Sequence, residues 1–532
     1  MPLDGDLRRR IGDWIEADPD PVTRATAQTM LASGNEAALL DCFGARLQFG
    51  TAGLRGPLGP GPNRMNRLVV RQAAAGLADY LLERDVRTAD RGVVIGFDAR
   101  HGSAAFALDT ACVLAARGVR ALLVPPHVPT PLLAWSITDL DAAAGVMVTA
   151  SHNPPQDNGY KVYLDDGAQI VSPHDSGISR RIDEAGLHIE VAPPSHTLIE
   201  RVGDDVIDRY LDAAAAVRLR RDVGSPLVVS TALHGVGGAL LARAFERAGF
   251  AAPVVVVAQQ EPDADFPTTP FPNPEEPGAM DAVVTLARER SADLAIANDP
   301  DADRMGVAIP GADGSWRVLS GDEVGWLLAE HILTYTSGTD RLVITTLVSS
   351  SMLSRMAHAH GVHHRETFTG FKWIGRTVLD HPELRFVFGY EQALGYLVTR
   401  QPLDKDGISA AVLMAEIAAC AVADGVTMEQ RLLAIRQRYG NLRTVEGSVR
   451  MAPSAAAARV DALAASPPRD IAGRRVTSVE EFPEAGLLRL WCGRARLQLR
   501  PSGTEPKVKL YVEVEDDDPE PLLAGLERVI TR

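Results

Sequence analysis

Short, almost wholly apolar segments alternate with longer segments of mixed polarity along most of this 532-residue chain. Such short apolar segments are typical of strands that are buried on both faces of a parallel sheet, with helices between them. They form three groups: GVVIGFDAR, ALLVP and AAAGVMVTA; then PLVVSTAL, PVVVVAQQ and LAIAND; then RLVITTL and RFVFGYE. We therefore predict three successive domains of mixed α/β type.

The last part of the chain follows a different pattern. Strand-like segments such as RTVEGSVRM, LLRLWC, RARLQLRP and KVKLYVEVE follow one another with fewer helices between them, which indicates an α+β domain. The predicted domains are residues 1–205, which begin with a helical extension, residues 206–314, residues 315–438 and residues 439–532. The predicted fold class is thus α/β, with a C-terminal α+β domain.

The hydrophobic fraction of 46% and the charged fraction of 23% are those of an ordinary globular protein. The N-terminal segment has no apolar core of the kind found in secretory signals. The longest apolar helix starts at Ile408 and contains Glu416; we expect it to be too short to span a bilayer and to lie in a protein core. The cysteines have no metal-ligand spacing, so we expect reduced thiols and a cytoplasmic location. They are Cys42, Cys112, Cys420 and Cys492.

The net charge of −15 argues against nucleic acid or an anionic membrane as a partner, and an anionic substrate would need a local cluster of cations. Only five of the 54 basic residues are lysines, and all five fall in loops or strands that look functional. Because lysine is a compact charge whose pKa is readily tuned, we expect some of them to act as proton-transfer groups or point charges; chance placement is the alternative, particularly for Lys507 and Lys509. They are Lys161, Lys372, Lys405, Lys507 and Lys509.

The strand in AAAGVMVTA ends at Ser151, and a loop with two prolines follows it in VTASHNPPQDNGYKVY. In open α/β sheets, ligands bind at the carboxyl ends of the strands. Ser151, held in this rigid loop with His152 and Lys161 nearby in sequence, is therefore predicted to be a nucleophile or a phosphate carrier. Serine, asparagine, proline and glycine also end strands without any chemical role, so the loop alone leaves that alternative open.

A second strand, LAIA, leads into NDPDADRMG, in which Asp299, Asp301 and Asp303 alternate. Alternating carboxylates in a tight loop form an oxygen site for Mg²⁺ or a similar cation. An EF-hand is excluded, because its sixth and twelfth positions are here Arg304 and Pro310. A phosphotransferase of the haloacid dehalogenase type, with Asp299 as its nucleophile, is the serious alternative.

Three further loops carry weaker signals. Glu391 in FGYEQALGY could accept hydrogen bonds from sugar hydroxyls or cap a helix, and FGTAGLRG carries Arg55 but lacks the lysine of a nucleotide-binding P-loop. The loop LQLRPSGTEP combines a guanidinium, two hydroxyls and exposed backbone N–H groups, which are the parts of a phosphate site. Its residues of interest are Arg500, Ser502, Gly503 and Thr504.

Together these loops resemble those of the α-D-phosphohexomutase superfamily, over nearly the whole chain and in the family's order. TASHNP at 149–154 resembles the phosphoserine loop, DPDADR at 299–304 the metal loop, GYEQALGY at 389–396 the sugar loop and RPSGTEP at 500–506 the phosphate loop. FGTAGLRG, TGFKWIG and LDKDG also resemble segments of the family. The resemblance implies four domains around a central cleft, three of them α/β and the C-terminal one smaller.

The resemblance also implies a phosphosugar mutase, an intramolecular phosphotransferase that interconverts hexose 1-phosphate and hexose 6-phosphate. Ser151 would be phosphorylated in the resting enzyme, and one Mg²⁺ per chain would bind the phosphoserine and the three aspartates. The substrate would pass through a sugar bisphosphate, which would also serve as the activator. The phosphoryl group would be surrounded by Arg55, His152, Lys161 and Arg304. The sugar would be bound by Thr369, Lys372, Glu391 and Lys405, and its other phosphate by Arg500, Ser502, Gly503 and Thr504.

The sugar loop departs from the common family form Gly-Glu-x-Ser-Gly-His, because Ala393 and Tyr396 replace the serine and the histidine. This form resembles the subgroup that contains type-2 phosphoglucomutase, phosphopentomutase and some bacterial phosphomannomutases. The sugar therefore stays open between glucose, mannose and pentose phosphates. Two further hypotheses are a phosphatase or phosphotransferase that uses Asp299, and a sugar-phosphate-binding protein without activity. A monomer and a dimer both agree with the sequence.

Overall fold

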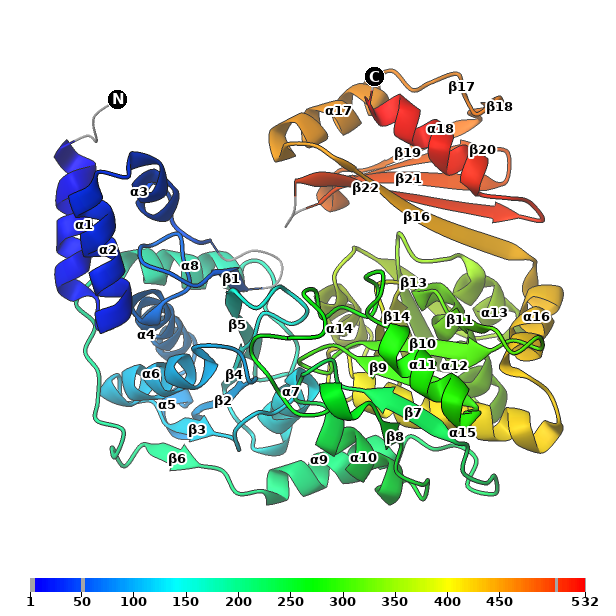
Figure 1. The fold of residues 1–532 in the computed structure, drawn as a ribbon, viewed down its shortest axis with the longest axis horizontal. Coiled ribbons are helices and arrows are strands. Elements are labelled where there is room, and N and C mark those ends of the chain that lie inside the picture. The colour runs from blue at the N-terminus through cyan, green and yellow to red at the C-terminus, as the bar shows by residue number, and fades with distance from the viewer. Residues whose placement is uncertain (1–4, 49–52, 503–505, 532) are drawn as a thin grey trace. The chain divides into compact units, whose positions relative to one another are not determined.

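The computed structural model describes residues 5–48, 53–502 and 506–531 (Figure 1). The chain divides into two compact units. Unit 1 contains Met1–Val318 and Gly395–Ala423, and unit 2 contains Leu319–Leu394 and Asp424–Arg532.

Unit 1 begins with the predicted helical extension, which consists of α1 (Gly5–Ala17), α2 (Pro21–Ser33) and α3 (Glu36–Phe43). Trp14 of α1 packs edge-on against Phe43 of α3, with the ring centroids 6.3 Å apart. Both side chains are buried and belong to the same apolar core as the first sheet of unit 1. The extension is therefore packed onto the first sheet domain through its apolar face.

The first sheet of unit 1 has six strands in the order β1-β5-β4-β2-β3-β6. Strands β4, β2, β3 and β6 run parallel, as the apolar segments predict, whereas β5 is antiparallel to both β4 and β1. No helix intervenes between β4 and β5, so the Ser151 loop joins them directly. The strands are β1 (Leu54–Pro57), β2 (Val93–Phe97), β3 (Ala121–Leu123), β4 (Ala144–Val148), β5 (Asp157–Leu164) and β6 (Ile199–Arg201). The helices of this domain are α4 (Arg67–Arg84), α5 (Thr88–Arg91), α6 (Ser103–Ala116), α7 (Thr130–Asp139) and α8 (His174–Glu184).

The second sheet of unit 1 has the order β11-β10-β9-β7-β8, with β7, β8 and β9 parallel and β10 antiparallel to both of its neighbours. The aspartate loop joins β9 to β10, and Asn298 lies opposite Met305 where it begins. The strand predicted in PVVVVAQQ is shorter than expected, because a 3₁₀ helix, η1 (Val257–Gln259), follows its two-residue β8. The strands are β7 (Val228–Thr231), β8 (Val254–Val255), β9 (Leu294–Asn298), β10 (Met305–Pro310) and β11 (Trp316–Val318). The helices are α9 (Asp205–Ala215), α10 (Gly238–Arg247) and α11 (Asp281–Arg290).

Unit 1 also contains β15 (Gly395–Leu397) and all but the last residue of α15 (Gly407–Asp424). With 18 residues, α15 is long and apolar enough to cross a membrane, so the expectation that its length excludes a span is wrong. Its burial nevertheless agrees with the predicted core helix, because 83% of this stretch is buried inside the protein. Glu416 in α15 is fully buried, and its carboxylate lies 3.2 Å from the guanidinium of Arg218. The pairing explains how an apolar core helix contains a charged residue.

Unit 2 contains a parallel sheet in which β12 lies between β13 and β14. The sequence of β13, HHRET, is polar and largely exposed, which is why no apolar segment predicts it. The strands are β12 (Arg341–Thr346), β13 (His363–Thr367) and β14 (Arg385–Glu391). The helices are α12 (Gly321–Tyr335), α13 (Met352–His360), α14 (Phe371–Asp380) and α16 (Met428–Tyr439).

The C-terminal part of unit 2 is an antiparallel sheet in the order β16-β22-β21-β20-β19, with two helices. Together with the three preceding sheets, it confirms the predicted α/β fold class with an α+β domain at the C-terminus. The strands are β16 (Leu442–Arg450), β17 (Asp470–Ile471), β18 (Arg474–Arg475), β19 (Ser478–Phe482), β20 (Leu487–Cys492), β21 (Ala495–Pro501) and β22 (Lys507–Glu515). The helices are α17 (Pro453–Ala465) and α18 (Glu520–Thr531), and a one-turn 3₁₀ helix, η2 (Pro483–Ala485), precedes β20.

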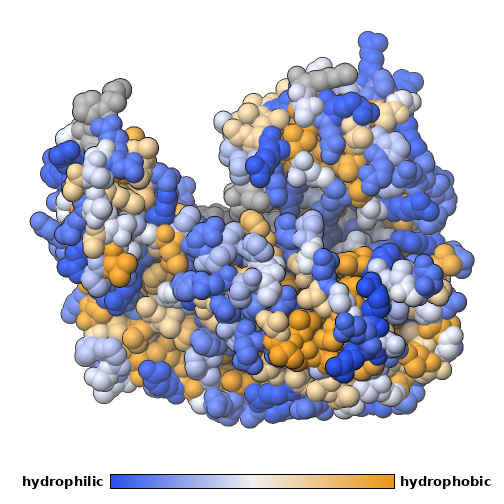
Figure 2. Space-filling model, viewed as in Figure 1, coloured by the Kyte–Doolittle hydropathy of each residue, from blue (hydrophilic) through white to orange (hydrophobic). Residues whose placement is uncertain are grey.

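Apolar side chains fill a core beneath each sheet, as in β21 and β22, where Leu497, Leu499, Leu510 and Val512 are buried. These residues alternate along their strands, so one face of the sheet packs against the helices. The face shown in Figure 2 carries hydrophilic residues with apolar ones between them. A mixed surface of this kind is usual for a folded protein.

Candidate active site

Ser151 lies in the turn that follows β4, and its side chain is buried. Its φ of +52° is in the left-handed region, which residues other than glycine rarely adopt. The Ser151 hydroxyl donates a hydrogen bond to Asp299 Oδ2 at 2.9 Å and lies 3.1 Å from His152 Nδ1. The fold thus brings the predicted nucleophile into contact with the predicted metal loop, 148 residues further along the chain. Strained backbone of this kind recurs at functional sites.

The three aspartates occupy the connection between β9 and β10, and all three side chains are completely or almost completely buried. One carboxylate oxygen from each of Asp299, Asp301 and Asp303 can be chosen so that all three lie within 4.8 Å of one another. Ala302 between them has a φ of +51°, which closes the turn tightly enough to gather alternate residues. The sequence predicted this cluster from its alternation alone.

The aspartate cluster fits a hard divalent cation. Asp301 Oδ1 and Asp303 Oδ1 are buried and have no hydrogen-bond partner among the residues that the structure describes. A buried carboxylate oxygen without a partner is costly, and coordination of an ion would satisfy it. Oxygen ligands of this type are those that Mg²⁺ prefers.

Two lysines from distant segments neutralise part of this charge. Lys161 Nζ on β5 lies 2.8 Å from Asp301 Oδ2 and 3.1 Å from Asp303 Oδ2, and Lys405 Nζ lies 3.2 Å from Asp303 Oδ2. Burial alone would lower the pKa of Lys161, but the two carboxylates raise it above its ordinary value. Lys161 is therefore a charged, buried donor at the edge of the aspartate cluster.

The same charges separate the pKa values of the aspartates. Burial, with Asp301 and Asp303 nearby, raises the pKa of Asp299 well above its ordinary value. Burial acts in the same direction on Asp301, but the charge and hydrogen bond of Lys161 outweigh it and lower the pKa of that carboxyl. Divergent pKa values among neighbouring carboxyls are typical of functional sites.

Three further predicted residues lie in or beside the Ser151 loop and the aspartate loop. Arg55 on β1 donates a hydrogen bond to Asn153 Oδ1 at 3.0 Å, and the backbone N–H of Arg304 donates to Asp299 Oδ1 at 3.0 Å. Burial, with the positive charges of Arg304 and Arg55 nearby, lowers the pKa of His152 well below its ordinary value. The imidazole is therefore neutral near pH 7, and its Nδ1 lies within hydrogen-bonding distance of the Ser151 oxygen, whose own proton is donated to Asp299.

The predicted sugar-binding residues divide between the two units. Lys405 lies in unit 1 beside Asp303 and Asp404, as its 3.2 Å and 3.3 Å ion pairs show. Thr369, Lys372 and Glu391 lie in unit 2, where Glu391 Oε1 accepts a hydrogen bond from the Gly370 N–H at 3.2 Å. This bond places the segment that contains Thr369 next to the predicted sugar loop.

Arg500 is the next-to-last residue of β21 in unit 2 and is half-buried, and the Ser502 N–H donates to the Lys507 carbonyl at 2.8 Å. Arg500 thus lies near the end of β21, and Ser502 lies in the short connection that leads from it to β22. Gly503 and Thr504, which were predicted to bind phosphate with them, lie outside the described residues.

Sequence reasoning missed two residues that support the site. The Thr130 hydroxyl, at the start of α7, donates to Asp301 Oδ2 at 2.6 Å, and Arg100 donates to the Ser151 carbonyl at 2.5 Å. Both follow the carboxyl end of a strand of the first sheet, which is the signal that could have found them.

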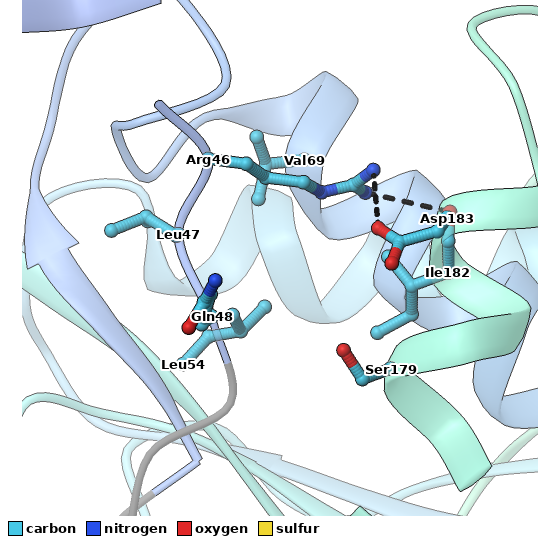
Figure 3. Close-up of a pocket in the computed structure, with 8 residues that line it drawn as sticks. All are labelled: Arg46, Leu47, Gln48, Leu54, Val69, Ser179, Ile182 and Asp183. Carbon is cyan, nitrogen blue, oxygen red and sulfur yellow. Dashed lines mark hydrogen bonds and ion pairs between the residues drawn. The ribbon is translucent and has the colours of Figure 1, made fainter. Parts of the chain in front are cut away.

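A cavity of about 120 Å³ elsewhere in the first sheet domain contains none of these residues. In Figure 3, Arg46 points toward Asp183, to which it is joined by a 3.2 Å ion pair, with Leu54 below it. Leu54 and Arg55 are neighbours on β1 and so face opposite sides of the strand. This cavity therefore lies on the other side of β1 from the Ser151 loop.

Comparison with known proteins shows the family. Four domain families match in order: phosphoglucomutase/phosphomannomutase alpha/beta/alpha domain I at residues 46–188, domain II at 208–312, domain III at 320–439 and the C-terminal domain at 444–521. A probable phosphomannomutase from Haemophilus influenzae is 40% identical over 468 residues, which cover 86% of this chain and 94% of the relative. This chain belongs to the α-D-phosphohexomutase superfamily.

Two more comparisons agree. Mouse phosphopentomutase is 34% identical over an alignment of 591 positions that covers 99% of this chain and 94% of the relative. The crystal structure of a putative phosphomannomutase from Thermus thermophilus shares the fold, with a TM-score of 0.72 at 24% identity over 92% of this chain and 100% of that one. The predicted superfamily is thereby confirmed, and this member of it is an intramolecular phosphotransferase of the phosphomutase type.

Proposed function

We propose that this phosphomutase interconverts hexose 1-phosphate and hexose 6-phosphate, with glucose or mannose as the sugar, through phosphorylated Ser151 and a sugar bisphosphate. The observation that carries the proposal is the 2.9 Å hydrogen bond from the Ser151 hydroxyl to Asp299 of the aspartate cluster. This contact supports the proposal, because the Ser151 oxygen lies beside carboxylates that could hold a cation, and transfer of a phosphoryl group needs charge neutralisation.

In the first half-reaction, the bond between phosphorus and Ser151 Oγ breaks and a bond from phosphorus to a sugar hydroxyl oxygen forms. The sugar hydroxyl loses its proton and Ser151 regains one. In the second half-reaction, the other phosphate of the bisphosphate transfers to Ser151 by the reverse of these steps. No phosphate is gained or lost overall, so the enzyme returns to its phosphorylated form.

The chain's own residues have separate tasks in both halves. Lys161 is a buried positive charge and a proton donor beside Asp301 and Asp303, and neutral His152 lies 3.1 Å from Ser151 Oγ, where it can hold that oxygen by a hydrogen bond. A divalent cation, for which Mg²⁺ is our proposal, would be held by the aspartate cluster and would neutralise charge on the transferring phosphoryl group.

For the bound sugar, we propose Glu391, Thr369 and Lys372 as the hydroxyl-binding set and Lys405 as a point charge close to the reacting phosphate, because Lys405 lies against Asp303. Arg500 and Ser502, with Gly503 and Thr504, would hold the phosphate that does not react. We also propose a cytoplasmic location, which agrees with the four free, buried cysteines.

A phosphopentomutase is the second candidate, because the mouse phosphopentomutase aligns with the N-terminal extension as well as the four domains. The two candidates differ only in the sugar that the unit 2 residues accept.

The test is a panel of glucose, mannose, glucosamine, ribose and deoxyribose 1-phosphates, each with Mg²⁺ and a trace of glucose 1,6-bisphosphate, followed by ³¹P NMR. We expect a 6-phosphate product from glucose or mannose with a kcat/KM at least about tenfold above that for the pentoses, a difference of about 1.4 kcal/mol. Turnover of the pentoses alone would establish the second candidate. No turnover of any sugar phosphate by the Mg²⁺-loaded protein would refute both.

A further inference from the structure

One guanidinium holds the backbone of the Ser151 loop. Arg100 Nη2 donates to the carbonyl oxygens of Ser151 and Asn153, both at 2.5 Å, and Nη1 donates to those of Pro154 at 2.8 Å and Asp157 at 3.2 Å. Four carbonyls of one seven-residue stretch therefore converge on a single side chain. A planar fork with donors on both nitrogens suits this task, whereas an ammonium has three donors at one point.

Arg100 is itself fixed from its own domain. The side chains of Arg100 and Asp98 are each 1% exposed, and the Arg100 Nε lies 3.4 Å from Asp98 Oδ2. Asp98 Oδ1 accepts hydrogen bonds from the Arg100 N–H at 3.0 Å and from the Ser103 hydroxyl at 2.7 Å. The Asp98 carboxylate thus accepts a hydrogen bond from the Arg100 backbone and neutralises the Arg100 side chain. These two contacts leave the guanidinium little freedom to move.

A residue of the second sheet domain covers the guanidinium. The ring of Phe266 lies 4.8 Å from Arg100 Cζ, and Phe266 is buried with a left-handed φ of +44°. Beside it, the carboxylate of Asp265 lies 2.7 Å from His101 Nε2. The domain that supplies Phe266 also supplies Asp299, so one contact joins the Ser151 loop to the domain of the aspartate cluster.

We propose that Arg100 is a positioning residue for phosphoryl transfer: it fixes the Ser151 loop, and Phe266 fixes Arg100 against the domain that carries the aspartates. The proposal rests on the proposed role of Ser151 as the phosphoryl carrier. Transfer needs the carrier oxygen in line with the reacting groups, and a displacement of about 1 Å can cost about 100-fold in rate. Arg100 touches no reacting atom, so its effect must appear in the rate and not in substrate affinity.

The chain contains a matched control in Arg218. This arginine is also buried against a carboxylate, Glu416, also donates to two backbone carbonyls, those of Ala248 at 2.6 Å and Arg220 at 2.7 Å, and also lies over a ring, with Phe250 at 4.0 Å. Its described contacts include none of the site residues. Replacement of Arg218 therefore disturbs a similar buried network without disturbing the Ser151 loop.

The experiment compares wild type, Arg100→Lys, Phe266→Leu and Arg218→Lys as full-length, Mg²⁺-loaded protein. Each is phosphorylated with glucose 1,6-bisphosphate, mixed with saturating glucose 1-phosphate that carries ¹⁸O in its phosphate, quenched, and analysed by intact mass for replacement of the unlabelled phosphate on Ser151 by the labelled one. The KM of steady-state turnover and the thermal midpoint are measured in parallel. We expect the single-turnover rate to fall about 100-fold in Arg100→Lys and about tenfold in Phe266→Leu, with KM within about threefold of wild type. Arg218→Lys should lower the thermal midpoint but keep the rate within about threefold.

A single-turnover rate of Arg100→Lys within about threefold of the wild-type rate would overturn the proposal. An equal loss of rate in Arg218→Lys would also overturn it, because the effect would then reflect general stability. If Arg100→Lys does not fold, Phe266→Leu decides, and a wild-type rate in that variant overturns the proposal. Failure of the proposed function has a different signature, because wild type itself would then carry no phosphate on Ser151.

Discussion

Replacement of Lys161 by methionine should tighten the binding of Mg²⁺. In the structure the Lys161 ammonium contacts two of the three predicted ligands, Asp301 at 2.8 Å and Asp303 at 3.1 Å. A divalent cation on the same carboxylates must approach this positive charge or displace it. Methionine has a similar length and no charge, so Lys161→Met removes the competitor and preserves most of the packing.

The size of the effect follows from the two distances. At an effective dielectric constant of about 20, a pair of unit charges at 2.8 Å attracts by about 6 kcal/mol and a pair at 3.1 Å by about 5 kcal/mol. Only about 1.4 kcal/mol is needed to change a dissociation constant tenfold. We therefore expect Lys161→Met to lower the Mg²⁺ dissociation constant at least about tenfold. Release of only a small part of the Lys161 attraction in wild type would account for this difference.

The same substitution should weaken the metal-free protein, because loss of one partner from a buried ion pair costs about 3–5 kcal/mol. Mg²⁺ should restore this loss, so the rise in thermal midpoint on addition of Mg²⁺ should be larger in Lys161→Met than in wild type. Sugar phosphate turnover should fall in the same variant, since Lys161 is also the proposed donor at the reacting phosphate.

The assay is isothermal titration calorimetry of MgCl₂ into metal-free wild type, Lys161→Met and Lys405→Met. Lys405 lies 3.2 Å from Asp303 and is shared with Asp404 at 3.3 Å, whereas Lys161 pairs with two of the aspartates, so removal of Lys405 should give a smaller gain. An unchanged or weaker Mg²⁺ affinity in Lys161→Met would refute the reasoning. It would mean that Lys161 holds the carboxylates in place for the ion and does not compete with it.

Three further predictions concern other parts of the molecule. A Cβ at Gly235 would lie 2.3 Å from Pro300 Cα in the aspartate loop, so Gly235→Ala should strain that loop by about 1–3 kcal/mol and weaken Mg²⁺ binding about tenfold in the same calorimetric assay. Burial raises the pKa of Asp322 from 3.8 to about 6. The protonated carboxyl therefore contributes to folding stability below about pH 4, and this contribution is lost as the pH rises through about 6. Asp322→Asn keeps an acceptor for the Tyr390 hydroxyl and should raise stability at pH 7 by up to about 3 kcal/mol but not at pH 4, a difference that thermal midpoints across this range would reveal. Glu391→Gln should raise the KM for the sugar phosphate about tenfold or more, through loss of a charged hydrogen-bond acceptor, and a fall in kcat alone would speak against sugar binding by Glu391.

The sequence was sufficient for those features that lie within one short segment. Ser151 and the three aspartates each follow an apolar strand, and the rule that ligands bind at strand ends was enough to single them out. The strands themselves were found where they were apolar, whereas the polar strand β13 was missed and β5 was not expected to run antiparallel.

Contacts between distant segments could not be predicted. The Thr130 hydroxyl meets Asp301 across 171 residues, and Lys161 meets the same carboxylate across 140 residues. Neither residue carries a local pattern that identifies its partner. Arg100 was missed for a related reason, because its role lies in binding backbone carbonyls, and any loop sequence offers those. The residues that contact a local motif from distant segments are known only once the chain is folded.

The position of the phosphate on the phosphorylated enzyme tests the central claim most directly. Metal-free protein treated with a phosphatase would be loaded with Mg²⁺, incubated with glucose 1,6-bisphosphate, and mapped by peptide mass spectrometry, with Ser151→Ala in parallel. Our account predicts one phosphate on the peptide that contains Ser151, and neither phosphorylation nor turnover in Ser151→Ala. Phosphate on Asp299, together with full activity of Ser151→Ala, would contradict it.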